Sequence, residues 1–142
     1  MEIAADAYTP LDETQIPTGQ IKELEGTPLD FRAPHVVGER IAQVPGGYDH
    51  NFVVPKADGS LQYIASVFEP ESGRFMEVFT TMPGIQFYTG NVLDGSVKTK
   101  AGRTFDKQCA LCLETQNFPD APNHPEFPSG ILRPGETYDH TT

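Results

Sequence analysis

The stretch Pro83-Gly84-Ile85-Gln86-Phe87-Tyr88-Thr89 alternates apolar and polar side chains almost without a break. Alternation with a period of two is typical of a β-strand that buries one face, and Pro-Gly marks a point where the chain turns before such a strand. Every second residue from Ile85 to Thr89 is expected on one face, with Gln86 and Tyr88 on the other. The stretch therefore predicts a strand with one buried face and one polar face.

Further strands are predicted before this stretch. Apolar residues flank the turn sequence Ala57-Asp58-Gly59-Ser60 and again the turn sequence Glu71-Ser72-Gly73. Asp-Gly supplies the positive-φ positions of a tight hairpin turn, and Ser-Gly is a common turn pair. Residues 52–81 are accordingly expected to form a three-stranded antiparallel meander.

The last strong strand is predicted over residues 108–115, where Glu114 shares a face with Ala110 and Cys112. Four prolines then predict a loop over residues 117–130, because proline is not tolerated in a helix interior or a central strand. A short hairpin is expected over residues 20–26, and one or two helical turns are expected near His35 to Gln43. No long helical periodicity and no internal repeat is present, which predicts one all-β unit of the sandwich type.

Charge and composition limit the partners and the location. The 142 residues carry 10 Lys and Arg against 20 Asp and Glu, a formal net charge of −10. Nucleic acid and anionic membranes would be repelled by this charge, whereas a neutral ligand such as a sugar would not. No apolar run approaches the ~20 residues of a membrane span, and the N-terminus lacks signal-peptide features. These observations favour a cytoplasmic protein.

Two cysteines, Cys109 and Cys112, have the C-x-x-C spacing of some redox and zinc sites. In an extended strand, residues three apart lie ~10 Å from each other at ~3.3 Å per residue, which exceeds the ~7 Å limit between the Cα atoms of a disulfide. The four histidines show no paired metal-ligand spacing. We therefore expect buried, reduced thiols and no metal.

Spacing alone leaves open the roles of three polar residues and one tyrosine. Glu114 lies at the end of an apolar strand just before a proline-rich loop, where it is either an ordinary exposed residue or a catalytic carboxylate. Asp49 lies in a polar run that also reads as a turn, and Gln86 could be an ordinary strand-surface amide. Tyr88 shares the predicted face of Gln86, where it would either pack against neighbours or stack beneath a ligand.

Several motifs, in a fixed order, give this sequence a resemblance to a known family. They include Gly46-Gly47-Tyr48-Asp49-His50-Asn51-Phe52, the stretch from Pro83 to Asn91, and Leu113-Glu114-Thr115-Gln116. With these motifs the sequence resembles the C-terminal part of the galactose mutarotases, or aldose 1-epimerases. The resemblance implies that residues 1–142 are a single unit, truncated at both ends, of a large antiparallel β-sandwich of the galactose mutarotase-like supersandwich type.

The same resemblance implies a function. It assigns Glu114 as the catalytic base, and Asp49 and Gln86 as residues that bind the sugar. The expected reaction interconverts the α and β anomers of hexoses such as galactose and glucose by general acid/base ring opening, with no cofactor. The family's general-acid histidine belongs to a motif that is absent here, and His50 and His124 are not assigned that role.

The missing acid leaves two hypotheses. One is an aldose 1-epimerase fragment, incomplete or weakly active alone, which could associate with a partner through exposed sheet edges. The alternative is a non-catalytic carbohydrate-binding or interaction module on the same fold. His124, in the proline-rich loop, is expected at the surface.

Overall fold

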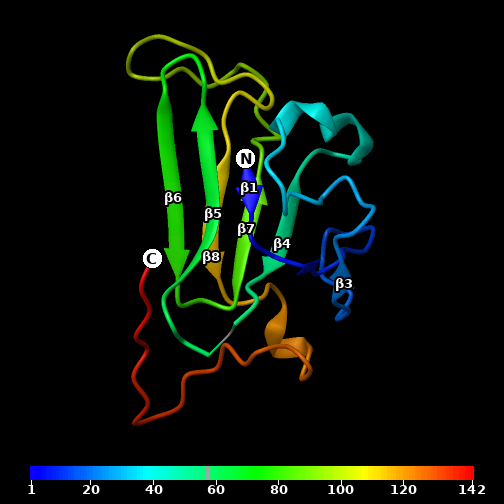
Figure 1. Ribbon diagram of the computed structural model, residues 1–142, viewed down its shortest axis with the longest axis vertical. Helices are drawn as coiled ribbons and strands as arrows, with labels where there is room; N and C mark the ends of the chain where they lie inside the picture. Colours follow the sequence, from blue (N-terminus) through cyan, green and yellow to red (C-terminus); the bar gives the residue numbers. More distant parts are fainter. Residues whose placement is uncertain (57) are drawn as a thin grey trace.

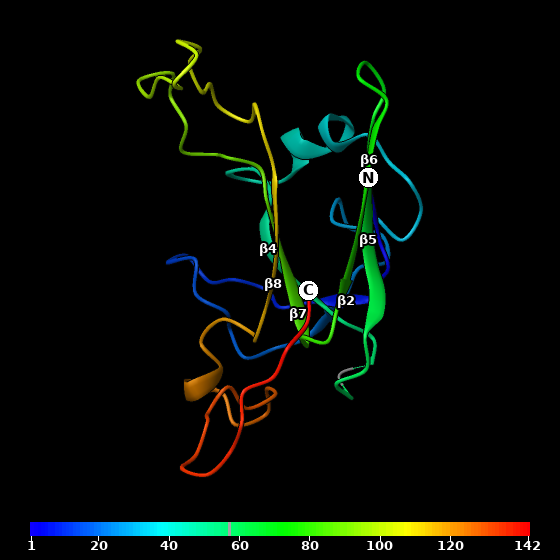
Figure 2. The same cartoon turned by 90° about the vertical axis from the view of Figure 1, so that its left-hand side faces the viewer.

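The computed structural model describes residues 1–56 and 58–142. These residues form two antiparallel sheets, which lie face to face as two layers (Figure 2). The three-stranded sheet has the order β1 (Glu2–Ile3), β5 (Gln62–Glu69), β6 (Arg74–Thr80). The five-stranded sheet has the order β3 (Lys22–Glu23), β2 (Ala7–Tyr8), β4 (Asp49–Val53), β7 (Gly84–Tyr88), β8 (Cys112–Gln116). The predicted all-β sandwich is confirmed (Figure 1).

Helical structure is limited to three single turns of 3₁₀-helix in the described ranges. They are η1 (Val37–Glu39), η2 (Ile41–Gln43) and η3 (Ala121–Asn123). The first two confirm the helical turns predicted near His35 to Gln43. Among the described residues, no helix combines the length and apolar character needed to cross a membrane.

The core fills the space between the two sheets. Phe87 of β7 lies at its centre, stacked on Tyr48 with ring centroids 4.9 Å apart and edge-on to Phe31 at 5.7 Å. All three aromatic side chains are fully buried, as are Phe52 of β4 and Ile64 of β5. Such burial is worth roughly 1.5 to 3 kcal/mol for a large apolar side chain, so this cluster holds the two layers together.

The alternation predicted for residues 85–89 is confirmed. Ile85 and Phe87 are fully buried and Thr89 nearly so, whereas Gln86 and Tyr88 are partly exposed on the other side of β7. The same two-residue period divides β4, where Phe52 faces the core and Asp49 faces outward. The five-stranded sheet thus has an inner apolar face and an outer polar face.

The meander predicted over residues 52–81 is wrong in its first half. β4 pairs with β2 and β7, whereas β5 pairs with β1 and β6, so β4 and β5 belong to different sheets. Phe52 of β4 faces the three-stranded sheet and Ile64 of β5 faces the five-stranded sheet, so both are fully buried between the layers. A flat hairpin of the two strands would leave one of those faces without a partner. Ala57, in the predicted turn, lies outside the described residues.

The second predicted hairpin, between β5 and β6, is confirmed. Gly73 has a φ of +71° at its turn, and the Glu69 carboxylate accepts hydrogen bonds from the backbone N–H groups of Glu71 and Ser72, each at 2.8 Å. A hydrogen bond from the Ser72 hydroxyl is the largest cause that holds the pKa of Glu69 below its usual value, and these two backbone hydrogen bonds add to it. A carboxylate at this position therefore stabilises the turn.

The N-terminal segment pairs differently from its prediction. The expected hairpin over residues 20–26 is wrong as a self-contained unit, because β3 pairs with β2, some fifteen residues earlier in the chain. Leu24, directly after β3, is fully buried in the core. The strand is placed by that buried side chain rather than by a local turn.

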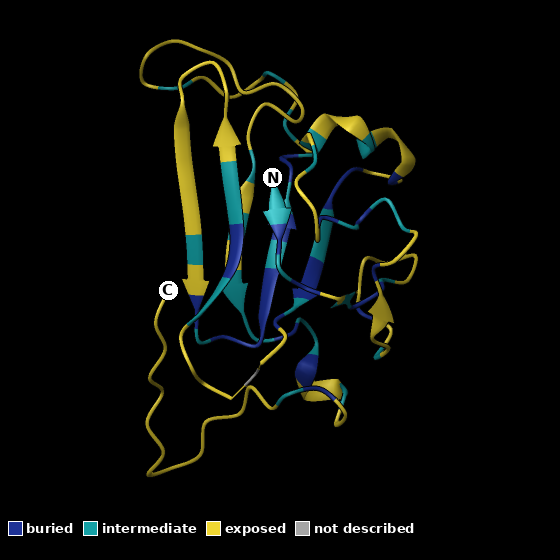
Figure 3. Ribbon diagram, viewed as in Figure 1, coloured by how far each residue is buried: buried dark blue, intermediate teal, exposed yellow. Residues whose placement is uncertain are grey.

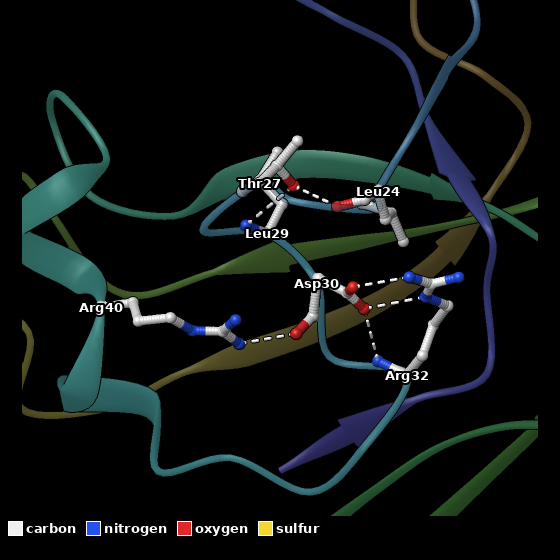
Figure 4. Close-up of polar contacts among 6 residues, drawn as sticks. All are labelled: Leu24, Thr27, Leu29, Asp30, Arg32 and Arg40. Carbon is white, nitrogen blue, oxygen red and sulfur yellow. Dashed lines mark hydrogen bonds and ion pairs between the residues drawn. The ribbon is translucent and has the colours of Figure 1, made fainter.

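The long connection from β3 to β4 is held by two arginines (Figure 4). Arg32 donates two hydrogen bonds to the Asp30 carboxylate, at 2.9 and 2.7 Å, which lowers the pKa of Asp30. Arg40 donates to the Asp30 backbone oxygen at 2.6 Å and lies 5.1 Å from the centre of the Phe31 ring. These contacts position Phe31 in the core, next to the strand that carries Asp49.

Candidate active site

The outer face of the five-stranded sheet brings the predicted residues together. The register of β4, β7 and β8 places Asn51 opposite Gln86, and Gln86 opposite Glu114. One row further along, Asp49 lies opposite Tyr88. Directly opposed residues of antiparallel strands share a face, so Asp49, Gln86 and Glu114 all lie on the outer face although they come from three strands.

One end of this outer face is covered by the proline-rich loop. Phe118 and Phe127 pack edge-to-face at 5.2 Å, and the cluster they form contacts Val53 of β4. His124 fixes the loop, since its Nε2 lies 3.1 Å from the Pro17 backbone oxygen and 3.2 Å from Asp120. His124, which was predicted at the surface, is partly buried, with 20% of its side chain exposed. The loop leaves the other end of the face open.

A cavity of about 440 Å³ occupies the open end. This volume falls within the ~300 to 1,000 Å³ typical of small-molecule sites. Asp49 and Glu114 both line it, and the backbone of residues 45–47 and the Asn91–Val92 turn form its walls. Its full lining is Gln15, Pro45, Gly46, Gly47, Asp49, Tyr88, Asn91, Val92 and Glu114.

The two carboxylates are held differently. Gln86 does not line the cavity itself, but it donates its side-chain amide to Asp49 Oδ1 at 2.7 Å, which fixes that carboxylate. Glu114 is exposed on β8 and takes no part in this contact. Asp49 is therefore suited to orienting a ligand hydroxyl, and Glu114 is accessible to a proton on one.

The wall beside Asp49 depends on a glycine and an asparagine. Gly47 has a φ of +89°, and a Cβ atom there would lie 2.1 Å from Asn91 Oδ1. The Asn91 side chain donates to the Tyr48 backbone oxygen at 2.8 Å and accepts from the Thr89 hydroxyl at 2.8 Å. Tyr88 joins the wall as well, since its hydroxyl accepts the Val92 N–H at 3.4 Å. The loop after β7 is thereby fixed against the loop before β4.

His50 faces away from this cavity. It lies on the opposite side of β4 from Asp49, edge-on to Tyr8 with ring centroids 6.2 Å apart, and lines a separate cavity of about 540 Å³. Burial lowers its pKa, and the nearby Asp49 charge offsets this only in part. The geometry thus gives His50 no contact with a ligand held between Asp49 and Glu114.

The cysteine prediction was partly wrong. Both thiols are free, but both are exposed rather than buried. Cys109 lies in a bend, because β8 begins at Cys112 and not at Gln108, and Cys112 lies on the outer face of β8 together with Glu114. In the described part of the chain, no group of three or more His, Cys, Asp or Glu side chains could hold a metal ion.

Sequence reasoning did not assign a role to two polar side chains on this face. Gln116 donates from Nε2 to Gln86 Oε1 at 2.9 Å and to Asn51 Oδ1 at 3.1 Å. Asn51 is 1% exposed. Both residues lie inside the quoted motifs, two positions from Glu114 and from Asp49, and period-two spacing is the signal that places them on the same face.

Known proteins match nearly the whole of this chain. The aldose 1-epimerase family profile matches residues 1–142. The galactose mutarotase of Rattus norvegicus is 52% identical over 141 residues, and the aldose 1-epimerase of Escherichia coli (strain K12) is 36% identical over 149. An aldose epimerase homologue from C. elegans superposes with a TM-score of 0.76 at 28% identity over 99% of this chain.

The matches cover nearly all of this chain but less than half of each relative. The chain spans 41% of the rat protein, 43% of the bacterial one and 42% of the C. elegans structure. Within that span the motifs around Asp49, Gln86 and Glu114 provided the resemblance noted from sequence. The match of the family profile to residues 1–142 shows that the chain belongs to the aldose 1-epimerase family.

Proposed function

We propose that this chain supplies the base and the sugar-binding groups of an aldose 1-epimerase that acts on hexoses such as galactose and glucose. The observation that carries the proposal is the shared cavity: Asp49 and Glu114 line it together, and Gln86 donates a hydrogen bond to Asp49. Two carboxylates with different supports, on one open sheet face, fit a ligand rich in neutral hydroxyl groups.

The chemistry follows from what each group can do. Glu114 accepts the proton of the anomeric hydroxyl, the bond between the anomeric carbon and the ring oxygen breaks, and the ring oxygen takes up a proton. Rotation of the resulting aldehyde and closure of the ring in the reverse sense give the other anomer. Asp49 holds a hydroxyl group of the sugar during both steps, and Gln86 keeps the Asp49 carboxylate in place.

The ring oxygen needs a proton donor. Among the described residues that line the cavity, no histidine and no third carboxyl group could supply that proton. Apart from Asp49 and Glu114, the lining residues are glycine, proline, valine, amides and Tyr88. Loss of a general acid commonly costs a factor of ~10² to 10⁴ in rate. The isolated chain is therefore expected to be a weak mutarotase.

The test uses a chimera in which this chain replaces the matching segment of the 52% identical rat protein. We expect Glu114→Gln, which keeps the shape of the side chain and removes its basicity, to slow galactose mutarotation at least ~100-fold by polarimetry. The matched control is Glu13→Gln, the same substitution at an exposed position. A rate near that of the unaltered chimera would reject Glu114 as the base.

A second candidate, a carbohydrate-binding module without catalysis, is favoured by the absence of an acid in the lining. The chimera separates the two functions. Galactose binding by calorimetry with no catalysed mutarotation, even in the chimera, would support the binding module. Binding together with mutarotation in the chimera would support the enzyme.

A further inference from the structure

Gln116 contacts the candidate site only through other side chains. It lies on the outer face of β8, two residues after Glu114, and does not line the cavity. Its Nε2 donates to Gln86 Oε1 at 2.9 Å and to Asn51 Oδ1 at 3.1 Å, which uses both hydrogens of the amide. The side chain thus joins β8 to β7 and β4.

Gly84 provides the space for these contacts. It is directly opposite Gln116 in the register, and a Cβ atom on it would lie 2.4 Å from Asn51 Oδ1 and 3.0 Å from the Phe118 ring. Only glycine, which has no Cβ atom, leaves that space free. The position of Gln116 therefore depends on the absence of a side chain on the neighbouring strand.

The direction of the hydrogen bonds follows from Asp49. An ionised carboxylate only accepts, so Gln86 must present Nε2 to Asp49 and Oε1 to Gln116. Gln116 must then present its Nε2, and Asn51 its Oδ1. Asn51 Nδ2 in turn faces the Thr9 hydroxyl at 3.4 Å. One negative charge fixes the orientation of three amides.

We propose that Gln116 is a positioning residue, which locks Gln86 so that it holds Asp49 Oδ1 and leaves Asp49 Oδ2 for a ligand. The nature of that ligand, a sugar, rests on the proposed function; the locking does not. Without Gln116, the Gln86 amide can rotate, and Asp49 loses its fixed donor. The residue acts on the site without touching what the site binds.

The decisive variant is Gln116→Glu, which keeps the shape but offers acceptors where Gln86 and Asn51 also offer acceptors. Gln86 must then turn its Nε2 away from Asp49. We expect the urea midpoint of unfolding to fall and the galactose Kd to rise about tenfold, the ~1.4 kcal/mol of one hydrogen bond. Adding Asp49→Asn, which can donate to the turned Gln86, should recover at least half of the loss in midpoint.

Repulsion between carboxylates is tested separately. Glu114 lies two residues from Gln116 on the same face of β8. If Gln116→Glu acted only by repulsion from the Glu114 carboxylate, adding Glu114→Gln would relieve it. We expect the double variant Gln116→Glu with Glu114→Gln to show no recovery of the urea midpoint. Gln20→Glu, at an exposed position, controls for the added charge and should leave the midpoint unchanged.

Each outcome bears on one claim. The locking of Gln86 is supported if the urea midpoint of Gln116→Glu recovers when Asp49→Asn is added but not when Glu114→Gln is added. Equal recovery with both additions, or recovery with neither, overturns it. A galactose Kd unaffected by Gln116→Glu overturns the positioning role. A wild-type chain that binds no galactose, but shows the coupling in unfolding, counts against the proposed function and leaves the locking supported.

Discussion

Gly84 shows how a single missing side chain shapes the site. It lies on β7, where two neighbouring groups, Asn51 Oδ1 and the Phe118 ring, come within 3.0 Å of the point that a Cβ atom would occupy. Both neighbours belong to buried residues, so neither can move freely. The glycine is required for packing and not for backbone conformation.

We predict that Gly84→Ala lowers the free energy of unfolding by about 1 to 3 kcal/mol, the usual cost of overpacking. Chemical denaturation of the two proteins measures it. Gly38→Ala is the control, since a Cβ atom at Gly38 meets nothing within 4 Å. Equal effects of the two substitutions would contradict the steric argument.

His50 makes stability depend on pH. Burial keeps its pKa in the folded chain below the ordinary value of 6.5, so the unfolded chain takes up a proton first as the pH falls. The contribution of neutral His50 is thus complete above pH 6.5 and is lost as the pH falls through the lower folded pKa. We predict a smaller unfolding free energy at pH 5.5 than at pH 7.5.

The contribution of His50 can be isolated by substitution. His50→Gln should flatten the loss of unfolding free energy between pH 7.5 and 5.5, a range above that in which carboxylates take up most of their protons. His140→Gln, at an exposed site, controls for the loss of an imidazole. An unchanged slope in His50→Gln would contradict the assignment.

At the scale of elements, β7 was predictable and the pairing of β4 was not. The alternation around Gln86 is a local pattern, and the burial of Ile85 and Phe87 follows it directly. The Asp58-Gly59 turn is also local, but such a turn serves a hairpin or a passage between sheets equally well. Which of the two occurs depends on the opposite layer, which no local pattern encodes.

The candidate site was predictable in its residues and not in its geometry. Motif resemblance assigned Glu114, Asp49 and Gln86, but the register that places them on one face links strands up to 65 residues apart, as the Asn51–Gln116 contact shows. The start of β8 was missed for a similar reason. The apolar residues before Cys112 fit a strand or a packed loop equally well, and tertiary contacts decide.

The exposure of the two cysteines at and before the start of β8 leads to a prediction about their thiols. Cys109 and Cys112 are free and exposed, so iodoacetamide should alkylate both in the folded protein at pH 8. Mass spectrometry without denaturant should show two adducts. Fewer than two would mean that a thiol is buried or bridged.

At the scale of the whole molecule, the three-stranded sheet exposes three phenylalanines on its outer surface. Phe68, Phe75 and Phe79 are 58%, 60% and 42% exposed, and β6 is a strand at the edge of its sheet (Figure 3). Exposed aromatic side chains beside an unpaired edge favour association. Relatives more than twice as long as this chain have additional segments that could cover such a surface.

We predict that the isolated chain self-associates through β6. Sedimentation velocity should show a concentration-dependent increase in mass, and Phe75→Lys with Phe79→Lys should reduce it by removing apolar contact area. Ile131→Lys with Leu132→Lys adds the same charge at exposed positions outside the sheets and serves as the control. A chain that stays monomeric at high concentration would contradict this prediction.

The two faces of β7 also affect how mutations would act on this protein. Ile85 and Phe87 anchor the core, while Gln86, between them, serves the cavity. A substitution at one position can therefore spare the other role. Loss of a single codon within β7 cannot, because every residue beyond the deletion changes sides, which exposes apolar groups and buries the amide. Among small genetic lesions, an in-frame deletion here should abolish folding and binding at once.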